Sequence, residues 1–482
     1  MAEVIPNWLT RQADLAPKKI ALEIDGEVSV TFSELYHQSK LMAQKLATLN
    51  LKPKDRVAIL STNSLDMLVT IHALSYLDVI VVLLNTRLTS KELDYQIKDS
   101  DTKVLITTHD FLSDKEFAIQ EIQTFTQIKE IELKKEVVLN ELIDLSDLWT
   151  IMYTSGTTGL PKAVAHTYGN HWWSAISSGL NLGIHADDKW LSPLPMFHVG
   201  GLSVFIKSVI YGMSVYLLPR YIKENLSYIL YEKQITIASL VTLMLADFIE
   251  DSRNDKAPEK LRAILLGGGS VPEKLLDKAK SKQIPLFQSY GMTETSSQIV
   301  SLSPANTLRK LGSAGKPLMP AEVKVTAKNN EVGEILVKGP MVISEYFNNE
   351  EATKSSFTSG WLKTGDLGYL DEEGFLYIVD RRSDLIVSGG ENVYPTEIEN
   401  ILLNHPDIKE VAVVKQADEK YGHIPIAFVV LKEKVDKPDF KLYVKDELAR
   451  YKQPREYYVI DELPRTASNK VKRFELEEQL KH

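Results

Sequence analysis

Apolar and polar residues alternate along the first part of the chain in a pattern that switches between helical and strand-like spacing. Residues 31–49 begin with the residue types of a helix cap and continue as an amphipathic stretch. A short apolar run predicts a strand at 56–60, and the order then repeats with a helix over 64–77, a buried strand over 79–84 and a capped helix over 89–98. This alternation predicts a parallel sheet with flanking helices.

The later part of the chain shows the shorter alternation that is typical of antiparallel hairpins. Residues 322–326 and 334–337 have strand-like patterns and flank a turn with two consecutive asparagines. A second hairpin is predicted over 368–379, where an acidic turn at 371–374 separates two apolar runs. Together these segments predict a small antiparallel β unit.

A charged run at 380–384 interrupts the apolar strands and predicts a domain boundary. Beyond it, helices are predicted over 395–403 and 440–448, and strands over 410–415 and 426–431. These elements predict a compact α+β unit of domain size.

We therefore predict an α/β protein with more than one domain, because 482 residues exceed the size at which a single hydrophobic core stops growing. The large N-terminal domain would comprise residues 1–380, with layered α/β subdomains and a small β-barrel-like unit. A small α+β C-terminal domain would comprise residues 384–482, with the boundary near 381–383.

Composition and charge narrow the functional classes. Because the chain has no cysteine, disulfides, thiolate metal sites and a cysteine nucleophile are excluded, and any thiol chemistry must use an external thiol. The formal net charge of −9 disfavours a nucleic-acid partner. No apolar run is long enough to span a bilayer or to form a signal peptide, so we expect no membrane insertion and a cytoplasmic location.

The strongest local signal is a loop rich in hydroxyls and glycines at residues 153–162, directly after the apolar run 148–152. Such a loop offers many hydrogen-bond donors with little steric bulk, which suits contact with phosphate oxygens, and Lys162 adds a cation. It is not a Walker loop, because Pro161 precedes the lysine and Ala163 follows it. Taken alone, a loop of this composition is more often a solvent-exposed turn.

The loop resembles the phosphate loop of the adenylate-forming superfamily, which contains acyl-CoA synthetases, peptide-synthetase adenylation domains and firefly luciferases. Further segments that resemble this family follow in the family's order at residues 267–269, 290–295, 364–366, 380–381 and 464–470. Chance is a poor explanation for order and spacing kept over so long a stretch. The resemblance implies an enzyme that uses ATP and Mg²⁺ to activate a carboxylic acid as its acyl-adenylate, and then transfers the acyl group to coenzyme A.

The resemblance also implies a role for each matching residue. Lys470 resembles the mobile catalytic lysine of adenylation, although Asn469 precedes it where many members have glycine. Glu294 would bind Mg²⁺ as a hard oxygen ligand. The residues implied in ATP binding are Thr154, Ser155, Gly156, Thr157, Thr158, Lys162, Gly268, Gly269, Tyr290, Thr293, Asp366 and Arg381.

The implied chemistry needs no general base. A substrate carboxylate is ionised at neutral pH and attacks the α-phosphorus in line, so catalysis consists of positioning and of neutralising charge. The thiol must then reach the acyl carbon, which similar enzymes achieve by rotating the C-terminal domain. The resemblance places the hinge at Arg382 or Ser383, of which we choose Ser383. It places the coenzyme A tunnel at Gly389, Gly390 and Glu391, where a plain β-turn is the alternative.

Residues 196–201 resemble the family element that walls the acid pocket. Its histidine, His198, would orient a polar acyl group or gate the pocket, although a lone histidine is more often structural. With Lys470 and Glu294 it completes the implied catalytic residues. The implied pocket residues are Phe197, His198, Met244, Gln288 and Ser289.

Within the superfamily, the short length and the segments PMFHVGGLS and PRTASNKVKR most resemble bacterial 2-succinylbenzoate–CoA ligases of menaquinone biosynthesis. Neither spacing nor composition identifies this aromatic keto-diacid. The alternatives are a ligase for aryl or medium-chain acids, a stand-alone adenylation enzyme that loads a carrier protein, and a non-enzymatic nucleotide sensor on the same fold. Similar enzymes are commonly dimers or tetramers, so the resemblance also implies a homo-oligomer.

Overall fold

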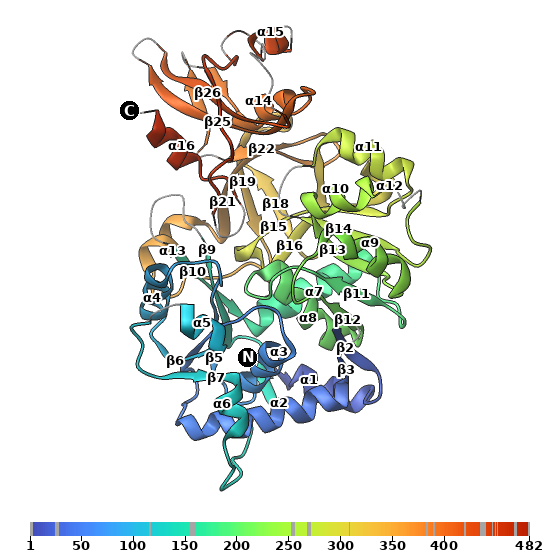
Figure 1. Cartoon of the computed structure of the whole chain (residues 1–482), viewed down its shortest axis with the longest axis vertical. Helices are drawn as coiled ribbons and strands as arrows, with labels where there is room; N and C mark the ends of the chain where they lie inside the picture. The colour runs from blue at the N-terminus through green and yellow to red at the C-terminus, as the bar shows by residue number, and fades with distance from the viewer. Residues whose placement is uncertain are drawn as a thin grey trace. The chain divides into compact units, whose positions relative to one another are not determined.

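The structure is a computed structural model of the chain (Figure 1). It describes residues 3–24, 28–114, 117–154, 161–251, 256–267, 271–307, 309–381, 384–388, 391–418, 421–433, 440–445, 447–448, 450, 452–466 and 470–480. The chain forms two compact units. Unit 1 comprises Met1–Val323 and Val337–Leu362, and unit 2 comprises Lys324–Leu336 and Lys363–His482.

Unit 1 contains two sheets with flanking helices, where the sequence pattern predicted one parallel sheet with flanking helices. The first sheet has the strand order β10-β9-β5-β4-β6-β7, in which only β10 is antiparallel to its neighbour. Its strands are β10 (Lys162–Thr167), β9 (Leu148–Thr154), β5 (Ile80–Leu83), β4 (Arg56–Leu60), β6 (Thr102–Thr107) and β7 (Ile122–Thr124). A separate short pair joins β1 (Val4–Pro6) to β8 (Leu142–Asp144).

The second sheet of unit 1 has the order β17-β16-β15-β14-β13-β11-β12-β2-β3. The strands from β15 to β2 in this order are parallel, and β16, β17 and β3 add antiparallel edges. The strands are β17 (Ser313–Pro317), β16 (Ser297–Leu302), β15 (Leu286–Met292), β14 (Ala263–Gly267), β13 (Ile237–Val241), β11 (Lys189–Ser192), β12 (Ser214–Leu217), β2 (Ile20–Ile24) and β3 (Val28–Thr31). The short strand β20 (Phe357–Thr358) pairs with the start of β21 (Trp361–Leu370).

Helices separate and cover the two sheets. Helix α7 contacts β10 and β16, and α8 contacts β11 and β12, so this pair lies between the sheets (Figure 1). Helices α9 to α11 cover the other face of the second sheet, and α4 packs on β6. The helices of unit 1 are α1 (Trp8–Leu15), α2 (Phe32–Leu46), α3 (Leu65–Ser75), α4 (Ser90–Asp99), α5 (His109–Asp114), α6 (Phe125–Glu130), α7 (Tyr168–Leu182), α8 (Val199–Tyr211), α9 (Lys223–Glu232), α10 (Thr242–Glu250), α11 (Glu273–Ser281), α12 (Pro304–Thr307) and α13 (Glu350–Ser356), with 3₁₀ turns η1 (Ala47–Leu49) and η2 (Thr293–Thr295).

The predicted helix caps are present in atomic detail. Thr31 accepts a hydrogen bond from the backbone N–H of Glu34, whose carboxylate accepts in return from the Thr31 backbone. Thr89 and Glu92 form the same capping box at the start of α4. These reciprocal bonds satisfy N–H groups that a helix start leaves unpaired, which explains why the pattern located both helix starts correctly.

Unit 2 combines the two predicted hairpins with the C-terminal α+β elements. In the first hairpin the Thr326 N–H donates to the Glu334 carbonyl at 3.0 Å, and in the second the Asp371 N–H donates to the Phe375 carbonyl at 3.0 Å. Its strands are the second half of β18 (Glu322–Val325), most of β19 (Gly333–Lys338), most of β21, β22 (Leu376–Arg381), β23 (Ile386–Ser388), β24 (Glu391–Val393), β25 (Ile408–Asp418), β26 (Gly422–Leu431) and β27 (Tyr457–Val459). Its helices are α14 (Pro395–Leu402), α15 (Phe440–Lys445) and α16 (Arg473–Gln479).

Polar contacts within unit 2 connect segments that are distant in sequence. Arg473 on α16 pairs with Asp384 at 3.1 Å and with Glu399 of α14 at 2.7 Å. The Thr396 N–H donates to the Asp380 carboxylate at 3.1 Å, which ties β22 to α14. The hairpins that we assigned to the N-terminal domain therefore group with the C-terminal elements in this compact unit. The hinge near 381–383 stays a prediction, and residues 382–383 lie outside the described residues.

One predicted element boundary was wrong. The helix expected over 440–448 ends at Lys445 as α15, and residues 447–448 form a turn. Leu448 is nevertheless buried in the same hydrophobic cluster as Phe440, so the apolar positions that suggested a longer helix serve the core without helical structure. None of the helices in the described part of the chain has the length and hydropathy that crossing a bilayer requires.

Candidate functional site

The ends of the predicted phosphate loop are held by an antiparallel strand pair. Thr154 ends β9 and Lys162 begins β10, and the two residues face each other across the pair. Both side chains are half-buried. The loop residues Ser155, Gly156, Thr157 and Thr158 lie outside the described residues. The fold therefore places the predicted loop at the carboxyl end of β9, an edge where α/β sheets bind ligands.

Two of the predicted phosphate-side residues meet at a tyrosine that the sequence analysis did not identify. The Tyr346 hydroxyl donates to Oε1 of Glu294 at 3.0 Å. The ammonium of Lys162 lies over the ring of the same tyrosine, 4.9 Å from its centroid. The Ile343 N–H also donates to the Glu294 carbonyl at 3.0 Å. Lys162 and Glu294, which are far apart in sequence, thus border one small region of unit 1.

A chain of buried hydrogen bonds supports the turn that carries Glu294. Nε2 of His166 lies 2.7 Å from the Thr293 carbonyl, Nδ1 of His166 lies 3.3 Å from the Thr150 hydroxyl, and that hydroxyl lies 2.8 Å from Nε2 of His171. Burial lowers the pKa of His166 to about 4 and holds the pKa of His171 well below its usual value, so both rings are neutral at pH 7.

The directions of these bonds follow from the chemistry of the acceptor. A carbonyl can only accept, so Nε2 of His166 carries the proton and Nδ1 accepts from the Thr150 hydroxyl. Nε2 of His171 then donates to Thr150, which leaves the buried Nδ1 of His171 with no partner in the described part of the chain. The result is a directed relay that ends on the backbone of Thr293.

The predicted acid-pocket residues follow the carboxyl ends of adjacent parallel strands. His198 comes after β11 and Met244 after β13, while Gln288 and Ser289 lie in β15 beside the end of β14. Parallel strands present these ends at one edge of the sheet. The structure therefore brings these four predicted residues to the same edge.

The contacts of the two β15 residues differ. The Ser289 hydroxyl donates to the Leu266 carbonyl at 2.9 Å, so it is engaged with the neighbouring strand. Gln288 is 8% exposed and its Nε2 has no partner among the described residues. An unpaired buried amide donor costs free energy unless a ligand satisfies it, which strengthens the prediction that Gln288 lines the pocket.

His198 occupies the residue before α8, and its ring packs edge-on against Phe197 with centroids 4.8 Å apart. The buried side chain of Asn63 holds the approach to this helix, because it donates to the Leu194 carbonyl at 3.0 Å and accepts from the Met196 N–H at 2.8 Å. Asn63 lies far from this helix in sequence, and a single asparagine has no sequence pattern that predicts such a role.

A fully buried lysine on α8 was also missed. Lys207 is 1% exposed, and its ammonium lies 5.3 Å from the centroid of the Trp190 ring. Among the described residues, its one hydrogen bond is to the Ser203 hydroxyl at 3.5 Å. No carboxylate in the described ranges forms an ion pair with it. Burial lowers the pKa of Lys207 to about 7. The available signal was a single lysine in the otherwise apolar run of this helix.

The remaining nucleotide candidates are divided between the units. In unit 1, Tyr290 is half-buried in β15, whereas Gly268 and Gly269 lie outside the described residues. In unit 2, Asp366 and Arg381 face each other across β21 and β22, so the structure brings this predicted pair together. The Asp366 N–H donates to the Thr364 hydroxyl at 3.1 Å, which holds the turn before it.

The predicted catalytic lysine ends a tight hairpin in unit 2. The Thr466 N–H donates to the Lys470 carbonyl at 2.7 Å, and the Lys470 N–H donates to the Thr466 hydroxyl at 3.1 Å. Lys470 is exposed, and Asn469 lies outside the described residues. Arg465 forms an ion pair with Glu410, which fixes the base of the hairpin.

The predicted coenzyme A tunnel is only partly described. Glu391 begins β24 and pairs with Ser388 of β23, whereas Gly389, Gly390 and the predicted hinge residue Ser383 lie outside the described residues. Across the ranges described, no three or more histidine, aspartate or glutamate side chains cluster as a metal site. Mg²⁺ that is held mainly by phosphate oxygens needs only one or two protein carboxylates, so Glu294 alone fits this requirement.

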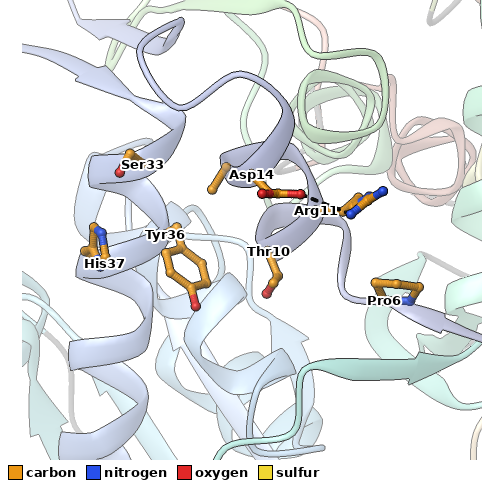
Figure 2. A pocket seen from close by; sticks show the side chains of 8 residues that line it. Pro6, Thr10, Arg11, Asp14, Ser33, Tyr36 and His37 are labelled. Atoms are coloured by element: carbon orange, nitrogen blue, oxygen red, sulfur yellow. Dashed lines mark hydrogen bonds and ion pairs between the residues drawn. The ribbon is translucent and has the colours of Figure 1, made fainter.

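A surface cleft of about 390 Å³ lies elsewhere in unit 1, between α1 and α2 (Figure 2). Arg11 and Asp14 on its wall pair with each other at 3.0 Å. It contains none of the predicted site residues. The chemistry-bearing side chains therefore gather at the strand ends and at Tyr346 instead.

Comparison with known proteins adds independent information. Residues 9–347 match the family of AMP-binding enzymes, and residues 397–470 match the AMP-binding enzyme C-terminal domain. The chain is 49% identical over 480 residues to the 2-succinylbenzoate–CoA ligase of Oceanobacillus iheyensis, which covers 99% of this chain and 100% of that protein.

Two solved structures of o-succinylbenzoate CoA synthetase from Bacillus subtilis have the same fold. The complex with the acyl-adenylate intermediate OSB-AMP is 45% identical and covers 98% of each chain, with a TM-score of 0.94. The complex with ATP and magnesium ion is 46% identical and covers 100% of each chain, also with a TM-score of 0.94.

Proposed function

The chain belongs to the AMP-binding enzyme family, and on this basis we propose that it is the 2-succinylbenzoate–CoA ligase of menaquinone biosynthesis. It joins 2-succinylbenzoate and ATP to form the acyl-adenylate and pyrophosphate, and then transfers the acyl group to coenzyme A with release of AMP. The observation that carries this proposal is the likeness, over the full length of both chains, to a structure that holds OSB-AMP. The contacts of Lys162 and Glu294 with one tyrosine also support it, as does the position of His198, Met244, Gln288 and Ser289 at one edge of the second sheet.

In the first half-reaction the substrate carboxylate attacks the α-phosphorus, and the residues around it position the groups and neutralise charge. Thr154, Lys162 and the loop between them bind the triphosphate. Glu294 holds Mg²⁺, which supplies positive charge to the phosphate oxygens. The Thr154 hydroxyl and the Lys162 ammonium can donate hydrogen bonds to phosphate oxygens, and the Glu294 carboxylate can ligate Mg²⁺. These three groups fit a magnesium–triphosphate.

The resemblance assigns two further groups of residues to the nucleoside. Tyr290, Gly268 and Gly269 form the adenine pocket, in which an aromatic face stacks on the base. Asp366 accepts hydrogen bonds from the ribose hydroxyls, and Arg381, opposite it in the hairpin, contacts the nucleotide. Thr293, in the turn directly before Glu294, contributes to ATP binding.

Lys470 neutralises charge that builds on the phosphoryl oxygens during adenylation, and its exposed place at a hairpin end suits a group that enters and leaves the site. The second half-reaction needs the C-terminal domain to turn about Ser383. Gly389, Gly390 and Glu391 then line the path of the pantetheine arm. His198 gates the acid pocket or orients the acyl group.

The substrate has two carboxylates, and Lys207 is our choice for the one that is not activated. A buried ammonium without a counter-ion is costly, and a substrate carboxylate would restore its charge balance. Lys207 lies on α8, the helix that His198 precedes, and its side chain lies along the helix toward Ser203, that is, toward the His198 end.

The test is to incubate the full chain with MgATP, coenzyme A and a panel of acids headed by 2-succinylbenzoate, and to follow pyrophosphate and thioester by mass spectrometry. We expect 2-succinylbenzoyl-CoA to form far faster than any other acyl-CoA. Faster formation of an aryl or fatty thioester would keep the ligase and reject this substrate. Acyl-AMP without thioester would indicate a carrier-loading enzyme, and no nucleotide chemistry would reject the proposal.

Further features of the protein remain proposals. A cytoplasmic location fits the use of ATP and coenzyme A and the absence of cysteine. Nucleic acid is not expected to bind. A homo-oligomer is implied by resemblance alone, and light scattering on the purified chain measures it directly.

A further inference from the structure

Tyr346 lies at the junction between β10 and the segment before α13. It forms an isolated β-bridge with Val164, and the next residue, Phe347, donates its N–H to the Ala163 carbonyl at 2.8 Å. The Tyr346 N–H donates to the Thr353 hydroxyl at 3.0 Å. The side chain is 6% exposed and packs with Val164 in a small hydrophobic cluster. The backbone and ring of Tyr346 are therefore fixed by contacts that do not involve the predicted site.

The polar end and the face of this tyrosine contact opposite charges. Its hydroxyl donates to Oε1 of Glu294 at 3.0 Å, and its ring lies 4.9 Å below the ammonium of Lys162. Burial, together with the neighbouring carboxylate of Glu294, raises the pKa of Tyr346 well above its usual value, so the hydroxyl stays protonated and acts as the donor.

These contacts keep the charges of Lys162 and Glu294 from pairing with each other. A lysine and a glutamate on the two sides of a small region attract each other, and a direct ion pair would occupy both groups. No ion pair between Lys162 and Glu294 occurs in the described part of the chain. The tyrosine offers each group a separate weak contact, since an aromatic face attracts a cation and a phenol donates to a carboxylate. Both charges thus remain oriented for a ligand that carries the opposite charges.

We propose that Tyr346 is a positioning residue that holds Lys162 and Glu294 apart and aimed at the magnesium–triphosphate. The inference rests on the proposed function, because that function is what assigns the phosphate and the metal to these two side chains. The turn of Glu294 is held separately through its backbone, by His166 on the Thr293 carbonyl and by the Ile343 N–H. Tyr346 therefore acts on the orientation of the carboxylate and not on the existence of the turn.

The test uses Tyr346→Phe, which removes the hydroxyl and keeps the packed ring. We expect adenylation, measured as acid-dependent exchange of pyrophosphate into ATP, to slow by about 10- to 100-fold, the factor that corresponds to losing a hydrogen bond to a charged group. The Mg²⁺ concentration for half-maximal rate should rise several-fold. Thioester formation from added acyl-adenylate and coenzyme A should stay within about twofold of wild type, because that step needs no triphosphate.

A binding measurement separates metal positioning from turnover. Titration of Mn²⁺ by electron paramagnetic resonance, with a non-reactive α,β-methylene analogue of ATP present, should give weaker binding in Tyr346→Phe. The matched control is Tyr221→Phe, which removes a tyrosine hydroxyl that bonds to the Asp247 carboxylate at 2.7 Å outside the predicted site. The control should match wild type in both assays. Tyr346→Leu, which also loses the ring under Lys162, should raise the KM for ATP beyond that of the phenylalanine variant.

Specific results would overturn the inference. The inference would be wrong if Tyr346→Phe bound Mn²⁺ and exchanged pyrophosphate as the wild type does. It would also be wrong if both half-reactions slowed equally with an unchanged metal dependence, because that result would indicate a purely structural role. Thermal unfolding of Tyr346→Phe near the wild-type temperature checks that the fold is intact. If wild type activates an acid other than 2-succinylbenzoate, the substrate proposal fails, and the same comparison runs with that acid.

Discussion

Two lysines of unit 1 are placed in contrasting environments. Lys162 is half-buried at the start of β10, with the ring of Tyr346 beneath it and the Glu294 carboxylate on the hydroxyl of the same tyrosine. Lys207 is fully buried on α8, with the Trp190 ring and one serine hydroxyl as its contacts and no ion pair in the described ranges. Lys162 has a carboxylate nearby that contacts the same tyrosine, whereas no carboxylate of the described residues forms an ion pair with Lys207.

The difference indicates two ways of preparing a cation for an anionic ligand. On the phosphate side, charges of both signs are kept in place, which suits a ligand that brings several negative oxygens and a metal ion. On the proposed acid side, Lys207 forms no ion pair in the described part of the chain, and in our proposal the second substrate carboxylate supplies its counter-charge. The first arrangement should serve every acid substrate, whereas the second should serve only acids with a second carboxylate.

Replacing Lys162 should have the largest effect. Lys162→Met should lower the rate of adenylation by about 1,000-fold, near the upper end of what removing one charge-stabilising donor costs an enzyme. The loss should be the same for every acid that the wild type activates, because the triphosphate is common to all. Pyrophosphate exchange with several acids measures this. A loss confined to 2-succinylbenzoate would contradict the division between the two sides.

Lys207→Met should give a smaller and selective effect. The kcat/KM for 2-succinylbenzoate should fall by about 100-fold, because a substrate carboxylate would be buried without its partner. Turnover of the monoacid analogue that keeps the activated carboxylate and lacks the other one should be unchanged or higher. Thermal unfolding should occur at the same or a higher temperature, since an uncompensated buried charge is removed. Equal loss with diacid and monoacids would contradict the assignment.

The activity of the wild type and of Lys207→Met should depend differently on pH. Burial lowers the pKa of Lys207 to about 7, so above pH 7 the free enzyme loses the ammonium that the second carboxylate requires. We expect kcat/KM for the diacid to fall by up to about tenfold per pH unit above that value, and Lys207→Met to lack this dependence.

The same group should affect stability with a defined sign. The unfolded chain retains the lysine proton up to about pH 10.4, whereas the folded chain loses it near 7, so the unfolded state binds more protons between these values. The contribution of Lys207 to folding stability therefore rises as pH rises from 7 to about 10. Urea unfolding of wild type and Lys207→Met at pH 7 and pH 9 should show a smaller gain for the variant.

The sequence predicted elements best where local chemistry decides the structure. The capping boxes of Thr31 and Thr89 and the strand at 56–60 depend on neighbours within a few residues, and the structure confirms them. The two compact units were harder, because a contact such as that between Thr396 and Asp380 joins segments that are separated in the chain. The end of helix α15 was predicted too late in the sequence, because an apolar residue such as Leu448 can be buried either inside or outside a helix.

The candidate site divides in the same way. Lys162, Glu294 and the pocket residues were identified from linear motifs, and the fold brings them to shared edges. Tyr346 and Asn63 act through contacts with distant segments, and a tyrosine or an asparagine has no linear signature for such a role. Lys207 gave a readable signal, a lone charge in an apolar helix, but its burial could only be established once α8 was placed between the sheets.

The smallest expected effect concerns the relay beneath Glu294. His166→Gln keeps a donor for the Thr293 carbonyl and an acceptor for Thr150, so adenylation should fall by no more than about threefold. His166→Leu removes both and should slow adenylation by about tenfold, the cost of one lost hydrogen bond. Pyrophosphate exchange measures both variants, and equal losses would indicate that volume and not hydrogen bonding matters.

A pH titration of stability provides the independent readout for this relay. Burial lowers the pKa of His166 to about 4, so between pH 6.5 and 4 the unfolded chain binds more protons and stability falls as pH falls. His72 and His171 act in the same direction, since burial lowers the pKa of each. His166→Leu should therefore lose only part of the slope, up to about 3 kcal/mol across this range. An unchanged slope would mean that the imidazole is not held neutral, and the directed relay onto Thr293 would lose its basis.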